Sequence, residues 1–431
     1  MKCIVHARIY DFVTYIEDGY ILFSDVIHEV GLMGNMPKFD CEIIDGTGKI
    51  VLPGLVCGHT HLYSAFARGL SLPFSPRNFQ EILDQLWWKL DRSLDLEMVY
   101  YSGIAFASDF LKNGVTTIID HHASGEITGS LEQLKKAVVD TAHLRGIFCF
   151  ETSDRFDTSK CIDENNHFIN NNHNEFTSGL FGLHASMTLS DDTLQRVSKE
   201  TTAPIHIHVA ESMMDQDDSI AKYHKRIVNR LNDFGLLRKE SLFVHGIFLN
   251  EQELNLIKKN DVTVCVNVSS NMNNGVGLAP VCKFLEKGIN VIIGNDGLSP
   301  SMANEYLSLY YAMHLQSKSP NLFTLDDVLQ IIINTYDYTS HLLKMPLGQI
   351  KKHYVADMLI LPYESITEVN KSNIFGHLFY GLFNSFKPET VIIAGNIEVS
   401  NYKVSKDLSK AINTGKSVSK ACWKKLQKEG I

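Results

Sequence analysis

The sequence predicts an α/β protein in which a (β/α)8 TIM barrel is inserted into a small β-sandwich domain built from both chain ends. Three observations predict this fold class. Eight short, apolar, β-branched runs alternate with stretches of helical periodicity, at a spacing of roughly 30 to 40 residues. No obvious glycine pattern of a dinucleotide-binding sheet accompanies them, which favours a closed barrel over an open doubly wound sheet. Further strand-like runs, which do not alternate with helical stretches, precede and follow this region.

The two chain ends are expected to form one β domain. Short alternating or apolar runs predict strands at 3–5, 20–23, 26–30 and 41–45, and similar runs return at 356–361 and 390–399. We therefore expect a sandwich made of residues 1–53 and 346–431, with a C-terminal helix, around a barrel of residues 54–345. The lysines between Lys403 and Lys428 are spaced among apolar residues, which predicts the solvated face of that helix rather than a binding arm.

The barrel region supplies eight candidate strands, at 55–59, 116–121, 146–150, 179–184, 204–209, 242–245, 262–267 and 290–296. Helical periodicity lies between them, at 79–90, 98–111, 131–144, 191–199, 220–234, 251–259 and 281–287. Ser190 with Asp191, and Asn250, provide N-cap signals for two of these helices. The Asn- and His-rich run 165–174 is interpreted as a surface loop before the fourth strand.

Composition narrows the class of protein. The chain has 431 residues, of which 44% are hydrophobic and 21% charged, as in ordinary globular proteins. Its formal charge of −9 argues against nucleic-acid binding, which needs a concentrated basic surface. No apolar run reaches the length of a membrane span, and no secretion signal is evident. The eight cysteines are scattered without a C-x-x-C pair, so we expect a cytoplasmic protein with free thiols.

The strand ends carry the residues that point to chemistry, beginning with His59 and His61. Side chains alternate along a strand, so these two imidazoles point the same way, and a same-facing pair is half of a transition-metal site. Two polar residues at a strand end would be the structural alternative. The polar residues at the ends of later strands favour the metal site, because catalytic residues of such barrels lie where strand C-termini meet the following loops.

The fifth and eighth strands extend the predicted site. His208 is the expected third ligand, and Glu211, three residues later, is the expected proton shuttle. Asp296 closes the eighth strand, where a carboxylate can bind a divalent ion and accept a proton. His206 is interpreted as a barrel-interior imidazole. His245 ends the sixth strand and either binds metal or, as we favour, orients the attacking water.

Other strand-end and aromatic residues are candidates for binding substrate. The fourth strand ends in His184 without the lysine that bridged two-metal barrel sites usually need, so one metal ion is expected and His184 faces the substrate. His121 and His122 alternate faces, so only one can point inward, and we expect one of them to contact substrate. Trp88 lies in a Trp-Trp pair, which predicts either a core side chain or a stacking surface.

These residues, in this order, carry a family resemblance. His59-Thr60-His61, the run 208–211, His245 and Asn295-Asp296-Gly297 resemble the amidohydrolase superfamily, in its deaminase-like branch with triazine chlorohydrolase-related enzymes. The runs 86–92, 119–124 and 270–274 are similar to SsnA-type aminohydrolases. The resemblance extends to Val399. It departs at 352–357, where the family often has Gly-Lys-x-Ala-Asp.

The resemblance implies one divalent metal ion, Zn2+ before Fe2+, held by His59, His61, His208 and Asp296. It also implies Glu211 as general acid and base, His245 beside the water and His184 at the substrate. We expect an aminohydrolase that deaminates a small N-heterocycle related to purines or pyrimidines. The alternatives are a ring-opening cyclic amide hydrolase and, remotely, a non-catalytic barrel that has lost its metal. The expected partner is a small molecule, with no nucleic acid or membrane, and the protein could form a homodimer.

Overall fold

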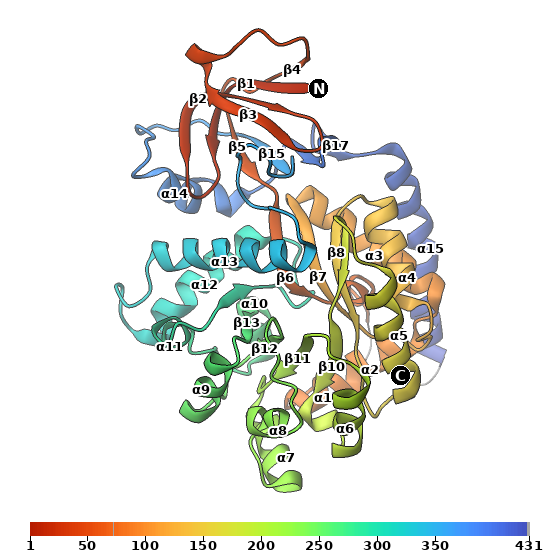
Figure 1. The fold of residues 1–431 in the computed structure, drawn as a ribbon. Helices are drawn as coiled ribbons and strands as arrows, with labels where there is room; N and C mark the ends of the chain where they lie inside the picture. The colour runs from red at the N-terminus through yellow and green to blue at the C-terminus, as the bar shows by residue number, and fades with distance from the viewer. Residues whose placement is uncertain (72, 429–431) are drawn as a thin grey trace.

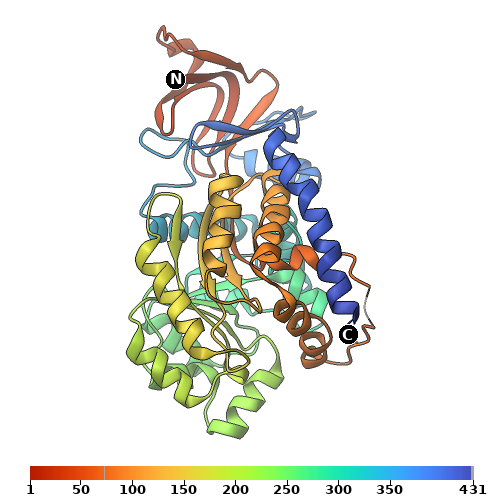
Figure 2. The same cartoon turned by 90° about the vertical axis from the view of Figure 1, so that its right-hand side faces the viewer.

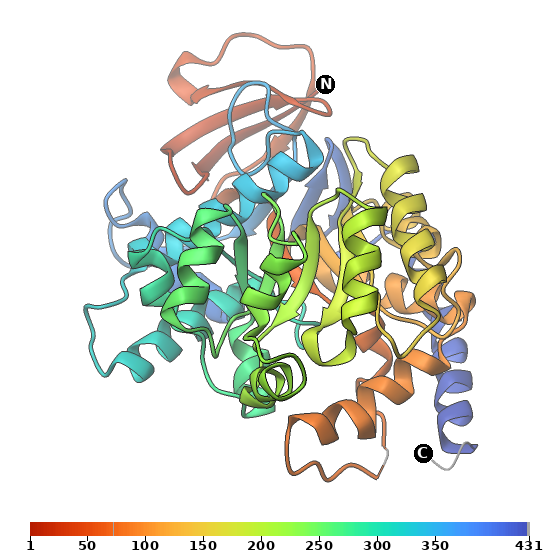
Figure 3. The ribbon, with the colours of Figure 1, turned by 60° about the horizontal axis from the view of Figure 1, so that its bottom comes forward.

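The computed structural model describes residues 1–71 and 73–428 of the chain. A β domain caps one end of a larger α/β body, and helices surround the parallel strands of that body (Figure 1, Figure 3). Within the described residues, no helix combines the length and the apolar character needed to cross a membrane.

Both chain ends build the β domain, as predicted. Its strands form one nine-stranded sheet in the order β18-β17-β16-β15-β5-β1-β2-β3, with β4 paired to β1. They are β1 (Lys2–Tyr10), β2 (Tyr15–Phe23), β3 (Ile27–Leu32), β4 (Glu42–Asp45), β5 (Lys49–Pro53), β15 (Met358–Pro362), β16 (Thr390–Ile393), β17 (Asn396–Ser400) and β18 (Lys403–Val404). The two ends join where β5 runs antiparallel to β15, with Pro53 opposite Met358. A core of its own, including Ile4, Phe23 and Ile360, stabilises the sheet.

The eight predicted barrel strands are all present. They are β6 (Leu55–Thr60), β7 (Val115–His122), β8 (Arg145–Phe150), β9 (Thr177–Gly179) with β10 (Phe181–Ala185), β11 (Ile205–Val209), β12 (Leu242–His245), β13 (Thr263–Val266) and β14 (Val291–Ile293). The fourth run is divided at Leu180, because β9 pairs with β8 whereas β10 pairs with β11.

The strands form two parallel sheets, with the orders β6-β7-β8-β9 and β10-β11-β12-β13-β14. The edges of these two sheets meet at two seams. Backbone hydrogen bonds cross both seams: His184 N donates to Thr152 O over 3.0 Å, and Asn295 N donates to His59 O over 2.9 Å. These bonds hold β14 beside β6, and β10 beside the chain that leaves β8. The strands therefore close into a barrel, whose carboxyl ends surround one central site.

Helices follow the strands around the barrel. They are α1 (Phe79–Ile82), α2 (Trp88–Ser93), α3 (Leu96–Lys112), α4 (Ser130–Lys135), α5 (Thr158–Asn171), α6 (Asp191–Glu200), α7 (Met213–Tyr223), α8 (Ile227–Asp233), α9 (Glu251–Lys259), α10 (Val268–Asn274), α11 (Val281–Glu286), α12 (Met302–Ser317) and α13 (Leu325–Leu343), with α14 (Ile374–Gly376) and α15 (Lys406–Lys428) beyond the barrel. Short 3-10 turns are η1 (Met33–Asn35), η2 (Leu62–Phe66), η5 (Ser186–Thr188) and η7 (Phe383–Ser385), and π turns are η3 (Leu83–Trp87), η4 (Lys136–Thr141) and η6 (His377–Leu382).

The structure corrects one predicted loop and one predicted helix. Most of the run 165–174 is not a surface loop, because residues 165–171 form the second half of α5 and only 172–174 lie beyond it. Asn165 is fully buried, with its side chain bonded to the backbone N and O of Phe150. The polar composition of this run did not indicate a helix. Its asparagine is buried because it forms hydrogen bonds with the backbone of β8. The run 220–234 is two helices, because the chain turns at His224, whose φ of 54° ends α7.

The C-terminal helix α15 lies along α3 on the side of the barrel (Figure 2). Leu408, Val418 and Leu426 are buried, whereas Lys424 is exposed, so the predicted solvated lysine face is confirmed. Trp423 Nε1 donates to Phe66 O over 2.7 Å and fixes the helix beside η2. The proposed domain boundaries at 53/54 and 345/346 stay predictions.

Candidate metal centre and active site

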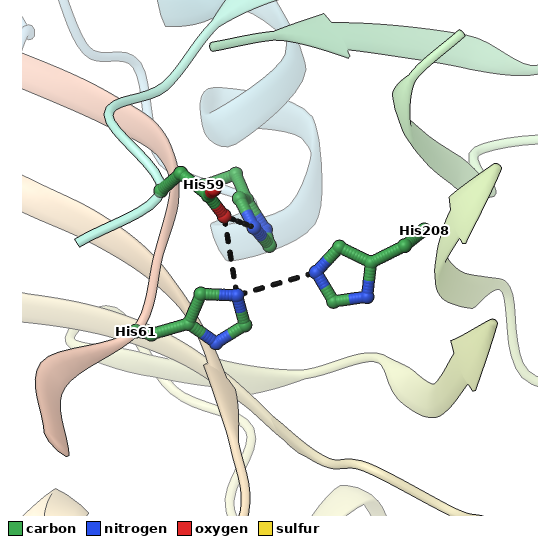
Figure 4. A group of neighbouring side chains, drawn as sticks. His59, His61 and His208 are labelled. Carbon is green, nitrogen blue, oxygen red and sulfur yellow. Dashed lines mark hydrogen bonds and ion pairs between the residues drawn. The ribbon is translucent and has the colours of Figure 1, made fainter. Parts of the chain in front are cut away.

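Four predicted ligands converge where the barrel strands end. His59 Nε2 and His61 Nε2 lie 3.0 Å and 3.2 Å from Asp296 Oδ1, and His61 Nε2 lies 3.2 Å from His208 Nε2 (Figure 4). One donor atom from each of these four residues lies within 4.8 Å of the others. Three imidazole nitrogens and one carboxylate oxygen form a donor set that suits a divalent transition metal. The residues present therefore fit a metal ion.

Three imidazoles around this centre, those of His61, His208 and His245, form a hydrogen bond through Nδ1, the nitrogen that points away from the centre. His61 Nδ1 donates to His121 O over 2.6 Å, and His208 Nδ1 donates to His184 O over 2.9 Å. His245 Nδ1 donates to Asn271 Oδ1 over 3.1 Å. Because a neutral imidazole carries one proton, these bonds leave each Nε2 lone pair facing the centre.

Asp296 reaches the centre from a strained turn after β14. Its φ is 56°, which positions the carboxylate beside His59, and Ser270 Oγ donates to Oδ2 over 2.6 Å. Burial opposes ionisation, but contacts with His59 and His61 hold the pKa of Asp296 well below its ordinary value. The carboxylate is therefore charged, as a ligand must be.

Glu211 lies beside the centre rather than in the four-residue ligand group. Its Oε2 is 3.5 Å from His245 Nε2, and His245 Nε2 is 4.0 Å from Asp296 Oδ1. Burial, followed by the nearby Asp296 charge, raises the pKa of Glu211 well above its ordinary value. A carboxyl group that binds its proton more tightly is suited to carry a proton between two reacting groups.

A cavity of about 460 Å³ adjoins these residues. Its lining includes residues of α1 and α2, which lie at the end of the barrel remote from the β domain (Figure 1). His61, His208, Glu211 and Asp296 form its polar floor, and the chain from Phe74 to Trp88 supplies an apolar and aromatic wall. A largely apolar pocket with a few polar groups is typical of a small-molecule site. His184 and Trp88 both line it, so two predicted substrate residues face the cavity.

The prediction for His121 and His122 needs correction, because neither side chain lines the cavity. His121 is fully buried beneath the centre, where Nε2 donates to Leu183 O over 3.0 Å. His122 points to the other face of β7, and its ring lies against Tyr63 and Phe150. Among the described residues neither nitrogen of His122 has a hydrogen-bond partner, and burial lowers its pKa to about 3. We therefore withdraw both residues from the substrate contacts.

A buried ion-pair cluster beside the cavity was not predicted. Arg155 Nη2 lies 2.7 Å from Asp91 Oδ2 and 2.7 Å from Glu151 Oε1, and its guanidinium stacks on Trp88 at 4.7 Å. Burial raises the pKa of Asp91 to about 6, although Arg155 opposes this effect. Glu151 directly follows the third strand, β8, and precedes Arg155 by four residues. This spacing was the only local sign of the ion pair. The pairing of Arg155 with Asp91 could not be predicted from sequence spacing, because 64 residues separate them.

Removing the Arg155 charge should therefore destabilise the protein. An Arg155→Met variant should lose about 3–5 kcal/mol of unfolding free energy at pH 7, because two buried carboxylates lose their cation. The folded-state pKa of Asp91 is raised to about 6 from 3.8, so its ionisation costs stability as pH rises through that window. The loss should consequently be smaller at pH 5 than at pH 7. Urea unfolding at both values, with Arg155→Lys as the charge-retaining control, measures it; equal losses at both pH values would contradict the explanation.

Comparisons with known proteins identify a family and several relatives that the chain resembles. Residues 50–397 match the amidohydrolase family. A 5'-deoxyadenosine deaminase from Methanocaldococcus jannaschii is 27% identical over 402 residues, covering 90% of this chain and 92% of that protein. A 5-methylthioadenosine/S-adenosylhomocysteine deaminase from Syntrophomonas wolfei is 27% identical over 427 residues, covering 94% and 95%.

Solved structures show the same fold at lower identity. A zinc-bound adenosine deaminase from Xanthomonas campestris superposes with a TM-score of 0.83 at 18% identity, covering 97% of this chain and 98% of that one. A zinc-complexed atrazine chlorohydrolase from Arthrobacter aurescens gives 0.79 at 18% identity, covering 97% and 100%. The arrangement of barrel and β domain is therefore a known one.

Proposed function

Because the chain belongs to the amidohydrolase family, we propose that it is a metal-dependent aminohydrolase that deaminates a small purine-related N-heterocycle, with water as the nucleophile. The observation that carries the proposal is the convergence of His59, His61, His208 and Asp296 beside Glu211, at the floor of a largely apolar cavity. The names of the relatives, which are deaminases of 5'-deoxyadenosine and methylthioadenosine, support a purine-related substrate.

We propose Zn2+ as the bound ion, with Fe2+ as the alternative, because three imidazoles and one carboxylate suit either metal. His59, His61, His208 and Asp296 would hold it. When bound, such an ion would supply a nucleophile at neutral pH, because a divalent metal lowers the pKa of water towards about 7.

The surrounding residues would orient the water and move its proton. His245 Nε2 and Asp296 Oδ1, 4.0 Å apart, would orient the water, and the Glu211 carboxylate would accept its proton. The water oxygen then bonds to the electrophilic ring carbon. Glu211 returns the proton to the departing nitrogen, the C–N bond breaks, and ammonia leaves. The product carries oxygen where the substrate carried the amino group.

His184 and Trp88 would hold the heterocycle in place. The Nδ1 atom of His184 bonds to Thr188 Oγ1 over 2.7 Å, and the ring lines the cavity, where it could bond to a ring nitrogen or oxygen of the substrate. Trp88 lines the same cavity and is backed by Arg155, so its ring face could stack on a planar base.

Truncating the stacking surface should weaken substrate binding more than chemistry. A Trp88→Ala variant should raise KM by roughly tenfold or more, because stacking of a base on an aromatic ring contributes about 1–3 kcal/mol. The value of kcat should change much less, since Trp88 is not part of the proposed proton path. Steady-state kinetics measure both constants. A Trp88→Phe variant keeps an aromatic face and should recover most of the affinity; a fall in kcat with unchanged KM would contradict the assignment.

The function itself is tested by ammonia release. Purified, Zn2+-loaded protein is incubated with adenine nucleosides, free purines, pyrimidines and their oxidised forms, and ammonia and product mass are measured together. Deamination replaces NH by O, whereas a ring-opening cyclic amide hydrolase would add one water without releasing ammonia. Mass gain without ammonia would support that alternative, and no reaction across the panel would contradict the proposed substrate class.

Two further predictions concern the protein as a whole. We propose a cytoplasmic homodimer, on the basis of the scattered free cysteines and the large helical surface of the barrel. Light scattering of the purified protein measures its oligomeric state directly.

A further inference from the structure

The proton of His59 is held differently from those of the other two histidine ligands. His61 and His208 each donate Nδ1–H to a backbone carbonyl, which can only accept, so their tautomers are fixed. His59 Nδ1 instead lies 2.8 Å from His206 Nε2, a ring nitrogen that can donate or accept. The tautomer of His59 therefore depends on what the other nitrogen of His206 contacts.

That other nitrogen contacts a buried thiol. His206 Nδ1 lies 3.3 Å from Cys149 Sγ on β8, and the same sulfur lies 3.7 Å from the backbone oxygen of Asp120 on β7. The side chains of Cys149 and His206 are fully buried, so the protein itself must supply their partners. Burial keeps the pKa of Cys149 well above its ordinary value, so its sulfur retains a proton that it can donate.

We infer that Cys149 and His206 form a hydrogen-bonded relay that positions His59, by keeping its proton on Nδ1 and its Nε2 lone pair toward the metal centre. In this relay Cys149 donates S–H to Asp120 O, and His206 donates Nδ1–H to Cys149 Sγ. His59 then donates Nδ1–H to His206 Nε2. Every donor has one acceptor, and all three histidine ligands present the same nitrogen to the centre.

The opposite direction of the relay would be incompatible with a ligand role. If His206 donated Nε2–H to His59 Nδ1, the His59 proton would lie on Nε2, beside Asp296 Oδ1 at 3.0 Å. A protonated nitrogen has no lone pair for a metal ion. Cys149 and His206 are thus positioning residues, and their role rests on the proposed function because it requires that the site binds metal.

Two substitutions of His206 separate positioning from packing. The Zn2+ affinity of the metal-free protein is measured by competition with a chromogenic chelator, and the fold of each variant is checked by thermal unfolding. His206→Phe fills the space but leaves His59 Nδ1–H without an acceptor, so it should weaken Zn2+ binding by about 10- to 100-fold, the range for lost outer-shell partners. His206→Gln places an amide oxygen near the Nε2 position and should recover most of that loss.

A second pair of variants tests the sulfur. Cys149→Ala removes the acceptor of His206 Nδ1–H and should weaken Zn2+ binding, whereas Cys149→Ser keeps a group that both donates and accepts and should bind nearly as the parent does. Cys161→Ala is the matched control, because Cys161 is equally buried on α5 and has no hydrogen bond to a histidine among the described residues. If His206→Phe fails to fold, the comparison of Cys149→Ala with Cys149→Ser tests the relay by itself.

The outcomes distinguish the relay from the site itself. Parent-like Zn2+ affinity in both His206→Phe and Cys149→Ala would overturn the relay and leave the metal site standing. Equal weakening in Cys149→Ala and Cys149→Ser would also overturn it, because the hydroxyl preserves the bonds. A parent protein that binds no Zn2+ would instead overturn the proposed metal site, and the relay with it.

Discussion

A Glu211→Gln variant is expected to keep its metal ion and to lose deamination by roughly 10²-fold or more. The amide has nearly the shape of the carboxyl group, but it cannot accept the proton of water or return it to the departing nitrogen. Glu211 lies outside the four-residue ligand group, which is why the metal should remain. Single-substrate kinetics on the compound identified by ammonia release give the activity, and elemental analysis gives the metal content.

The matched control is Glu164→Gln, which makes the same change in another buried carboxyl group. Glu164 accepts hydrogen bonds from Gly129 N and Leu131 N, and it is not among the residues that line the cavity. Its variant should retain parent-like turnover. Parent-like turnover in Glu211→Gln would remove Glu211 from the mechanism, and loss of metal there would make it a ligand instead.

A His61→Ala variant is expected to lose both metal and activity. His61 Nε2 lies within 3.2 Å of donor atoms on both Asp296 and His208, so its removal opens the ligand group on two sides. Metal content per chain after dialysis measures the loss. A full equivalent of metal retained in this variant would contradict the ligand assignment.

The control for this experiment is His122→Phe. His122 is buried close by on β7 and lies between the rings of Tyr63 and Phe150, without a hydrogen-bond partner among the described residues. Phenylalanine should therefore fit the same apolar contacts, and the variant should keep a full equivalent of metal. Metal loss in both variants would indicate general disruption of the barrel rather than loss of a ligand.

The sequence by itself determined the architecture and identified the residues proposed as metal ligands. Buried parallel strands have to be apolar runs, so all eight were visible, and their C-terminal ends could be identified from where polar residues follow. His59, His61, His208 and Asp296 stand at such ends, and in the barrel these ends surround one centre, where the four side chains meet. The periodicity of two along a strand also fixed that His59 and His61 face the same way.

Only the tertiary structure decided which face of each strand meets the cavity and which distant groups pair. His121 and His122 alternate on β7, but both are covered by neighbouring strands and side chains that no local pattern reveals. The partnership of Arg155 with Asp91 spans 64 residues, and that of His59 with His206 spans 147. Local periodicity records the environment of an element, whereas long-range pairs depend on how elements pack. The proton positions inferred for the proposed ligand imidazoles depend on such long-range pairs, so they can be argued only from the folded structure.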